Sequence, residues 1–239
     1  MISAVTPPKG QASPTHNNFP VRETLAITVR LPFGGTSGGG PFHSQSIEAI
    51  YAHYPGLVVL TPATVEDAYS MLIEAVAIDD PVIFCEHKFL YRHLKAEKLP
   101  SEALPIGKAR IAREGRDLTI VAYSAMVHDA LEAATELATE GWEVEVVDLR
   151  SVKPLDTDTI IASVARTGRL LCVGEAFPWG GVTAEVIARV TTEGFALLDV
   201  PPQRLNAKDT PIPYHPNLWL AHRPTPQTVA AAARNILRQ

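Results

Sequence analysis

Short apolar runs alternate with amphipathic stretches along most of this chain, and this alternation restricts the possible folds more than any other feature. The runs at 26–31, 58–60 and 82–85 are rich in β-branched or aliphatic residues and are bounded by turn residues, as buried strands are. Between the last two, Thr64 precedes a stretch over 65–76 that has acids in its first turn and apolar residues on one helical face. This block therefore predicts parallel strands joined by helices.

A second block repeats the pattern after residue 115. We expect strands in four segments: 118–122, 144–149, 170–174 and 195–200. We expect helices around four others: 127–138, 160–165, 186–190 and 229–237, with a further helix in the first block over 44–54. Thr225 and Pro226 are expected to cap and begin the last of the four. The fold class predicted is α/β, with two domains that each carry a mostly parallel sheet covered by helices.

The remaining segments divide the chain into regions. Residues 1–24 carry several prolines and little aliphatic content, which predicts a disordered or atypical tail. Residues 95–115 are charged and show no period, so we interpret them as a linker. The domains expected are therefore 25–100 and 101–239.

Composition excludes several classes of function. The 239 residues are 46% hydrophobic with a net charge of −5, and basic residues form no continuous run, so a nucleic-acid partner is not expected. The sequence shows neither a signal peptide nor an apolar run long enough to cross a membrane, so we expect a cytoplasmic protein without a membrane partner. Cys85 and Cys172 lie in apolar runs, which favours buried thiols.

One loop stands out as a candidate site. Residues 34–40 contain five glycines and lead directly into His43. Glycine lets the backbone approach a bound group closely, and imidazole can accept and return a proton near neutral pH. The alternative is a flexible surface loop followed by a helix that Ser44 or Ser46 caps.

Other catalytic motifs are missing from the sequence. It contains no P-loop, no dinucleotide-binding G-x-G-x-x-G, no G-x-S-x-G elbow and no zinc-binding spacing. The glycines are therefore not interpreted as a nucleotide-phosphate site.

Several ordered strings resemble the E1 β subunit of 2-oxo acid dehydrogenase complexes, of pyruvate, branched-chain or acetoin type. In the first block they are Ile27-Thr28-Val29-Arg30, His43-Ser44-Gln45-Ser46, Pro55-Gly56-Leu57-Val58-Val59 and Asp79-Asp80-Pro81-Val82. In the second block they are Val146-Val147-Asp148-Leu149-Arg150, Gly174-Glu175-Ala176 and Asp209-Thr210-Pro211-Ile212-Pro213. The resemblance implies a partial transketolase-like pyrimidine-binding domain followed by a transketolase C-terminal domain.

The resemblance also implies an activity. Such a β subunit works with an E1 α subunit and a second β subunit in the oxidative decarboxylation of a 2-oxo acid, and the acyl group passes to the lipoyl group of an E2 acyltransferase. This is oxidoreductase chemistry on an oxo group with a disulfide acceptor. Thiamine diphosphate supplies the reactive carbanion, and in this family the α subunit holds its diphosphate and Mg²⁺. This chain alone is expected to be inactive.

Site residues are carried over position by position. His43 matches the family histidine that faces the cofactor and substrate and assists the acyl intermediate or its transfer. The family also binds K⁺, chiefly through backbone oxygens, and oxygen ligands suit such a hard cation. The matching positions are Ile27, Thr28, Ala75, Ile78 and Asp80.

The chain departs from the family ahead of residue 27. The family's glutamate that activates the cofactor lies in that part, and nothing around Glu23 matches it, so the chain is interpreted as an N-terminally truncated relative. A non-catalytic module for assembly or E2 docking is the alternative, and a piece of a single-chain relative such as transketolase is a third.

Other polar and aromatic residues receive structural interpretations. His53, His87 and His93 are expected to be structural or solvated, and Glu175 and Asp148 to be structural. Three aromatic residues are expected either to border the substrate pocket or to pack in the core: Phe33, Phe42 and Tyr51.

Overall fold

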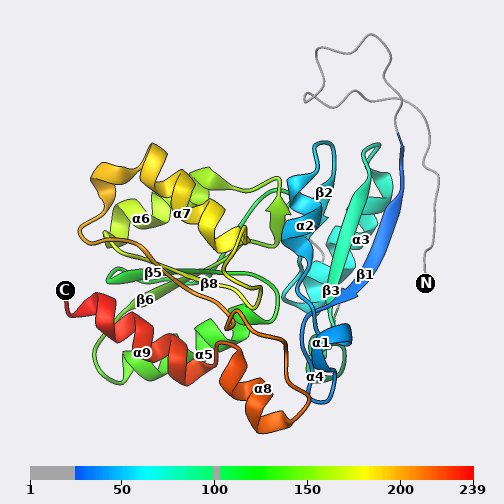
Figure 1. The fold of residues 1–239 in the computed structure, drawn as a ribbon. Coiled ribbons are helices and arrows are strands. Elements are labelled where there is room, and N and C mark those ends of the chain that lie inside the picture. Colours follow the sequence, from blue (N-terminus) through cyan, green and yellow to red (C-terminus); the bar gives the residue numbers. More distant parts are fainter. Residues whose placement is uncertain (1–24, 99–102) are drawn as a thin grey trace.

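The chain folds into two α/β units that lie side by side (Figure 1). The structure is a computed structural model, and it describes residues 25–98 and 103–239. The tail predicted over 1–24 lies outside these residues. Across the described part, no helix is both long and apolar enough to span a membrane.

The first unit is built on a four-stranded sheet in the order β1-β3-β2-β7. Its strands are β1 (Thr28–Phe33), β2 (Val58–Leu60), β3 (Val82–His87) and β7 (Ser151–Lys153). β1, β2 and β3 are parallel, whereas β7 pairs antiparallel with β2. Its helices are α1 (Gly40–His43), α2 (Glu48–His53), α3 (Val65–Ala77) and α4 (Leu90–His93).

The second unit carries a five-stranded sheet in the order β4-β6-β5-β8-β9. These strands are β4 (Arg110–Arg113), β5 (Leu118–Ala122), β6 (Val144–Asp148), β8 (Leu170–Val173) and β9 (Gln203–Leu205). The helices are α5 (Met126–Ala138), α6 (Thr157–Thr167), α7 (Val182–Glu193), the 3₁₀ turn η1 (Phe195–Leu197), α8 (Pro216–His222) and α9 (Pro226–Leu237). Figure 1 shows α6 and α7 on one face of the sheet and α5 and α9 on the other.

The apolar core continues from one unit into the other. Phe33 and Ile83 of the first sheet belong to the same buried cluster as Val121 and Val147 of the second. Burial of both faces explains why these strands are almost wholly apolar, as in parallel sheets generally. The two-unit α/β architecture predicted from the sequence is confirmed.

Helix ends follow the predicted local chemistry. Thr64 Oγ1 accepts a hydrogen bond from the Asp67 N–H at 3.1 Å and so caps α3. Thr225 and Thr228 form a reciprocal capping box at the start of α9, with Pro226 at the first helical position. These contacts satisfy N–H groups that a helix start otherwise leaves without partners.

Two segments to which the sequence analysis assigned a structure have a different one. The expected linker over 95–115 contains β4, whose residues are only half-buried and pair antiparallel with β6 at the sheet edge. An edge strand of this kind lacks the apolar run by which buried strands are recognised. The strand expected over 195–200 is instead the turn η1, because Phe195 lies on the surface with 72% of its area exposed.

A network of four charged residues, three of them buried, joins the two units. Arg150 is fully buried, and its Nε donates to Asp67 Oδ1 of α3 at 2.8 Å. Arg110 donates to both acids of the network, to Asp67 Oδ2 at 2.9 Å and to Asp148 Oδ2 at 2.7 Å. The other Arg150 nitrogens donate to three carbonyl oxygens of the connecting segment, those of Leu104, Pro105 and Lys108. One guanidinium thus fixes α3 and the connection between the units.

We expect Arg150→Met to lower the free energy of unfolding by about 3–5 kcal/mol, because Asp67 and three carbonyl groups lose their buried partner. Urea unfolding of the full chain measures this loss. Arg189→Met is the control: Arg189 pairs with Glu185 on the exposed face of α7, so its loss costs less than about 1 kcal/mol. Equal losses in the two variants would contradict the role assigned to Arg150.

Asp148 makes the stability of the folded chain depend on pH. Burial raises its pKa to about 6, against the opposing effect of Arg110. The folded chain therefore binds this proton more tightly than the unfolded chain does, so acidification from pH 7 to about pH 4 favours the folded state at this residue.

We expect wild type to gain up to about 3 kcal/mol of stability relative to Asp148→Asn over that pH range, since asparagine does not titrate. Urea unfolding of both proteins at several pH values measures the difference. A difference that does not change with pH would refute this assignment.

Candidate functional site

The glycine-rich loop lies at the carboxyl ends of the parallel strands of the first sheet. It follows β1 directly and leads through α1 to His43, and Figure 1 shows α1 beside α4 at this end of the sheet. Ligands of α/β sheets commonly bind at the carboxyl ends of the strands. The His43 side chain is exposed, while Lys88 Nζ donates to its backbone carbonyl.

Hydrogen bonds within the first unit close this loop on itself. The Gly34 N–H donates to the Gln45 carbonyl at 3.0 Å, and Gln45 Nε2 donates to the Pro41 carbonyl at 2.8 Å. Ser44 and Ser46 do not cap a helix: the residue preceding α2 is Ile47, and both serine Oγ atoms are buried without a protein partner. The alternative in which Ser44 or Ser46 caps the following helix is therefore wrong.

Two glycines of the loop occupy places that no larger residue would fit. A Cβ on Gly34 would lie 2.1 Å from His87 Nε2, and one on Gly35 would lie 2.6 Å from Glu175 Oε1 and 2.5 Å from Trp219 Nε1. Gly34 also has a φ of +76°, which side chains disfavour. The glycines therefore allow the loop to pack directly on side chains from both units.

Beneath the loop, His87 and Glu175 form a buried pair. His87 Nε2 and Glu175 Oε2 are 2.7 Å apart, and the two side chains are 3% and 10% exposed. His87 Nδ1 accepts the Phe89 N–H at 3.3 Å, which places the ring proton on Nε2, facing the carboxylate. Burial opposes ionisation of Glu175, but His87, Arg223 and the Gly35 N–H outweigh it and lower its pKa.

A second buried acid lies on α2. Glu48 is fully buried and accepts the Tyr123 hydroxyl at 2.7 Å. Burial raises the pKa of Glu48, and its Oε2 has no protein partner. Tyr123 and Ser124 line a very small cavity of about 10 Å³ with Ser46. Sequence reasoning missed this acid because it follows the loop as an ordinary helical residue.

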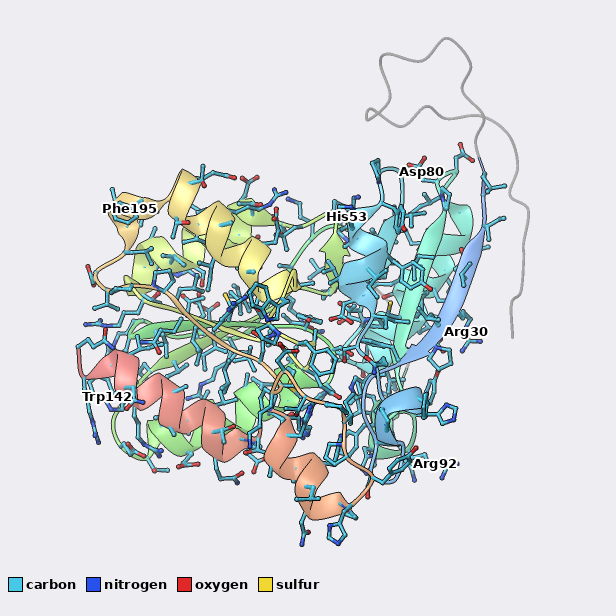
Figure 2. All side chains as sticks on the ribbon, viewed as in Figure 1. Arg30, His53, Asp80, Arg92, Trp142 and Phe195 are labelled. Atoms are coloured by element: carbon cyan, nitrogen blue, oxygen red, sulfur yellow. The ribbon has the colours of Figure 1, made fainter. Side chains whose placement is uncertain are left out.

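The residues expected to hold K⁺ lie at the other end of the first sheet. Thr28 Oγ1 donates to the Ala75 carbonyl at 3.0 Å, so the start of β1 meets the end of α3 there. Ile27, Ile78 and Asp80 are all partly buried, and Figure 2 shows Asp80 at the opposite end of the unit from Arg92 of α4. β1 separates this group of oxygens from the glycine-rich loop by about 20 Å.

The other histidines and the aromatic residues considered in the sequence analysis differ in how far they are buried. His53 and His93 are exposed, whereas His87 is buried against the loop. Phe33 is buried, and Phe42, beside His43, is 80% exposed. Tyr51 is half-buried on α2.

The two cysteines do not belong to a metal-binding cluster in the described residues. Both cysteines, Cys85 and Cys172, are buried and free, and burial raises the pKa of each thiol. Within residues 25–98 and 103–239, no group of three or more histidine, cysteine or acidic side chains is placed to hold a metal ion.

Two domain families match the chain. Residues 18–93 match the pyrimidine binding domain of transketolase, and residues 107–229 match the transketolase C-terminal domain. A solved structure described as a split gene transketolase, inactive beta4 tetramer, superposes with a TM-score of 0.75 at 26% identity, over 90% of this chain and 67% of that one.

Similar proteins of known identity are β subunits. The chain is 46% identical to the mitochondrial pyruvate dehydrogenase E1 component subunit beta-2 of Oryza sativa subsp. japonica, over 88% of this chain and 57% of that protein. It is 43% identical to the pyruvate dehydrogenase E1 component subunit beta of Bacillus subtilis, over 90% of this chain and 66% of that protein. It is 39% identical to the acetoin:2,6-dichlorophenolindophenol oxidoreductase subunit beta of Cupriavidus necator, over 95% and 68%.

The chain thus spans between 57% and 68% of the length of these three relatives. The order of the two matched domains agrees with the order of the two α/β units along the chain. The chain belongs to the transketolase-like family of 2-oxo acid dehydrogenase E1 β subunits.

Proposed function

We propose that this chain acts as the β subunit, or a part of it, of a thiamine diphosphate-dependent E1 enzyme that decarboxylates a 2-oxo acid together with an α subunit. The acyl group then passes to a lipoyl group on an E2 acyltransferase. The observation that carries the proposal is the exposed His43, presented by a glycine-rich loop at the carboxyl ends of the strands. The sequence similarity to E1 β subunits supports the same reaction class.

The residues present fit one side of a cofactor site. The exposed ring of Phe42 and the exposed imidazole of His43 lie next to each other at the end of α1, and together they offer an apolar surface and a proton-transfer group. When bound, thiamine diphosphate supplies a carbanion-forming centre. We propose that the α subunit holds its diphosphate and Mg²⁺.

His43 carries the proton chemistry proposed for this chain. Its backbone is fixed by the hydrogen bond from Lys88 to its carbonyl, so the imidazole is presented from a held position. Imidazole can give a proton to a developing oxyanion and take it back near neutral pH. An exposed histidine on a held backbone therefore suits the transfer of an acyl group.

This loop does not present a cofactor-activating acid. Glu175, which contacts the loop, directs its carboxylate oxygens to Gly35 and His87. Glu48 is buried beneath it and bonded to Tyr123. Both carboxylates are thus buried or nearly so, and this observation favours the second candidate function, an assembly or E2-docking module without cofactor activation.

We expect His43→Ala, in complex with the E1 α subunit of the same organism, to lower 2-oxo acid turnover by about 100-fold or more, the usual contribution of a positioned acid–base group. The exposed side chain makes no core contact, so complex formation and melting temperature should stay at wild-type values. Turnover is measured with thiamine diphosphate, Mg²⁺ and a lipoyl-bearing E2 as the acyl acceptor.

His53→Ala is the matched control, because His53 is also exposed but lies at the far end of α2. It should leave turnover unchanged. A stable wild-type complex without turnover would reject the catalytic proposal and favour the assembly module, and full turnover in His43→Ala would reject the role of His43.

We also propose a K⁺ site formed by oxygens of Ile27, Thr28, Ala75, Ile78 and Asp80. Thr28 Oγ1 and the Ala75 carbonyl are already 3.0 Å apart, and carbonyl, hydroxyl and carboxylate oxygens are the donors that hard cations prefer. A cation there stabilises the contact between the start of β1 and the end of α3.

We expect K⁺ at 100 times its dissociation constant to stabilise the chain by about 3 kcal/mol relative to a solution without it, because it binds the folded form alone. Thermal melting in KCl and in tetramethylammonium chloride of equal ionic strength measures the effect. Thr28→Val should abolish the K⁺ dependence and Thr28→Ser should retain it, whereas equal melting in the two salts for wild type would contradict the site.

A further inference from the structure

Three side chains of the second unit lie against glycines of the glycine-rich loop. Glu175 follows β8, and Tyr214 and Trp219 come from the segment that includes α8. Glu175 and Trp219 both lie against Gly35. A Cβ on Gly40 would lie 2.2 Å from Cε1 of the Tyr214 ring. The loop belongs to the first unit, yet the second unit determines where it can lie.

Among these three residues, Glu175 forms hydrogen bonds through both of its carboxylate oxygens. Oε1 accepts the Gly35 N–H at 2.6 Å, and Oε2 accepts the His87 Nε2–H at 2.7 Å. The His87 ring is held from its other side by the Phe89 N–H. Charge-assisted bonds to a buried carboxylate are stronger than neutral ones, so this geometry resists displacement.

Two short routes connect this carboxylate with His43. Along the loop, the Gly34 N–H, beside the residue that Glu175 binds, donates to the carbonyl of Gln45. Through β3, His87 is followed by Lys88, which donates to the His43 carbonyl. Glu175 therefore fixes both backbone segments between which His43 lies.

We propose that Glu175 is a positioning residue by which the second unit holds the glycine-rich loop and orients His43. The proposal deepens the proposed function and rests on it wherever turnover is the readout. It assigns the second unit a part in the site besides assembly, since Glu175 reaches the loop from 140 residues away in the chain.

Hydrogen–deuterium exchange of the full chain tests the proposal without any enzymatic assay. We expect Glu175→Ala to raise deuterium uptake in residues 33–43, because Gly35 and His87 lose their shared acceptor. Glu175→Gln keeps the side-chain shape and one acceptor oxygen, so one of the two donors then faces an amide NH₂ and uptake should be intermediate. Glu185→Ala, on the exposed face of α7, should match wild type.

Kinetics with the α subunit give the second readout. We expect Glu175→Ala to lower kcat by about 100-fold, the loss typical when a reacting group is misplaced from a distance, with a much smaller change in KM. Glu175→Gln should recover part of kcat. A purely structural role would lower the amount of folded complex in both variants and leave the kcat of the remaining complex unchanged.

Wild-type uptake over residues 33–43 in both Glu175 variants would overturn the proposal, as would a wild-type kcat in Glu175→Ala. If Glu175→Ala loosens the whole chain, Glu175→Gln decides: uptake raised in 33–43 alone supports the proposal, and unchanged uptake overturns it. Raised uptake in a complex that shows no turnover even as wild type would reject the proposed function and leave the positioning of the loop by Glu175 supported.

Discussion

The buried guanidinium of Arg150 is the interaction on which the rest of this structure depends. A buried guanidinium is costly unless it is paired and hydrogen-bonded. Each of the three Arg150 nitrogens has an acceptor, and these acceptors come from α3 and from the segment that connects the two units. The units are therefore fixed relative to each other, and Phe33 of one sheet can pack in the same cluster as Val121 of the other.

This fixed arrangement explains why the loop needs glycine at two positions. At Gly34 and Gly35 no Cβ would fit, because His87, Glu175 and Trp219 occupy the space beside them. In a chain whose units moved freely, a loop without side chains would only add conformational entropy to the unfolded state. Here the missing side chains allow a carboxylate of one unit to bind the backbone of the other at 2.6 Å.

The sequence pattern predicted those features that depend on residues close together in the chain. The apolar runs located the buried strands, and Thr64 and Thr225 located two helix starts, because strand burial and capping each involve neighbouring residues. β4 and β7 escaped recognition because each is short and lies at a sheet edge, where half-buried or polar residues are tolerated. Edge strands are defined by the strand they pair with, and that pairing leaves no period in the sequence.

The same difference separates the site residues that the sequence predicted from those that it did not. His43 is visible in the sequence because a run of glycines precedes it, although its imidazole is exposed in the structure. Glu175 and His87 carry no such signal: they lie 88 residues apart, and each alone resembles an ordinary structural residue. The local sequence thus identifies His43, the group proposed to react. The orientation proposed for it depends on contacts that form only when the two units pack together. If Glu175 positions His43 as proposed, a chain that keeps the histidine still loses its site when the second unit no longer holds the loop.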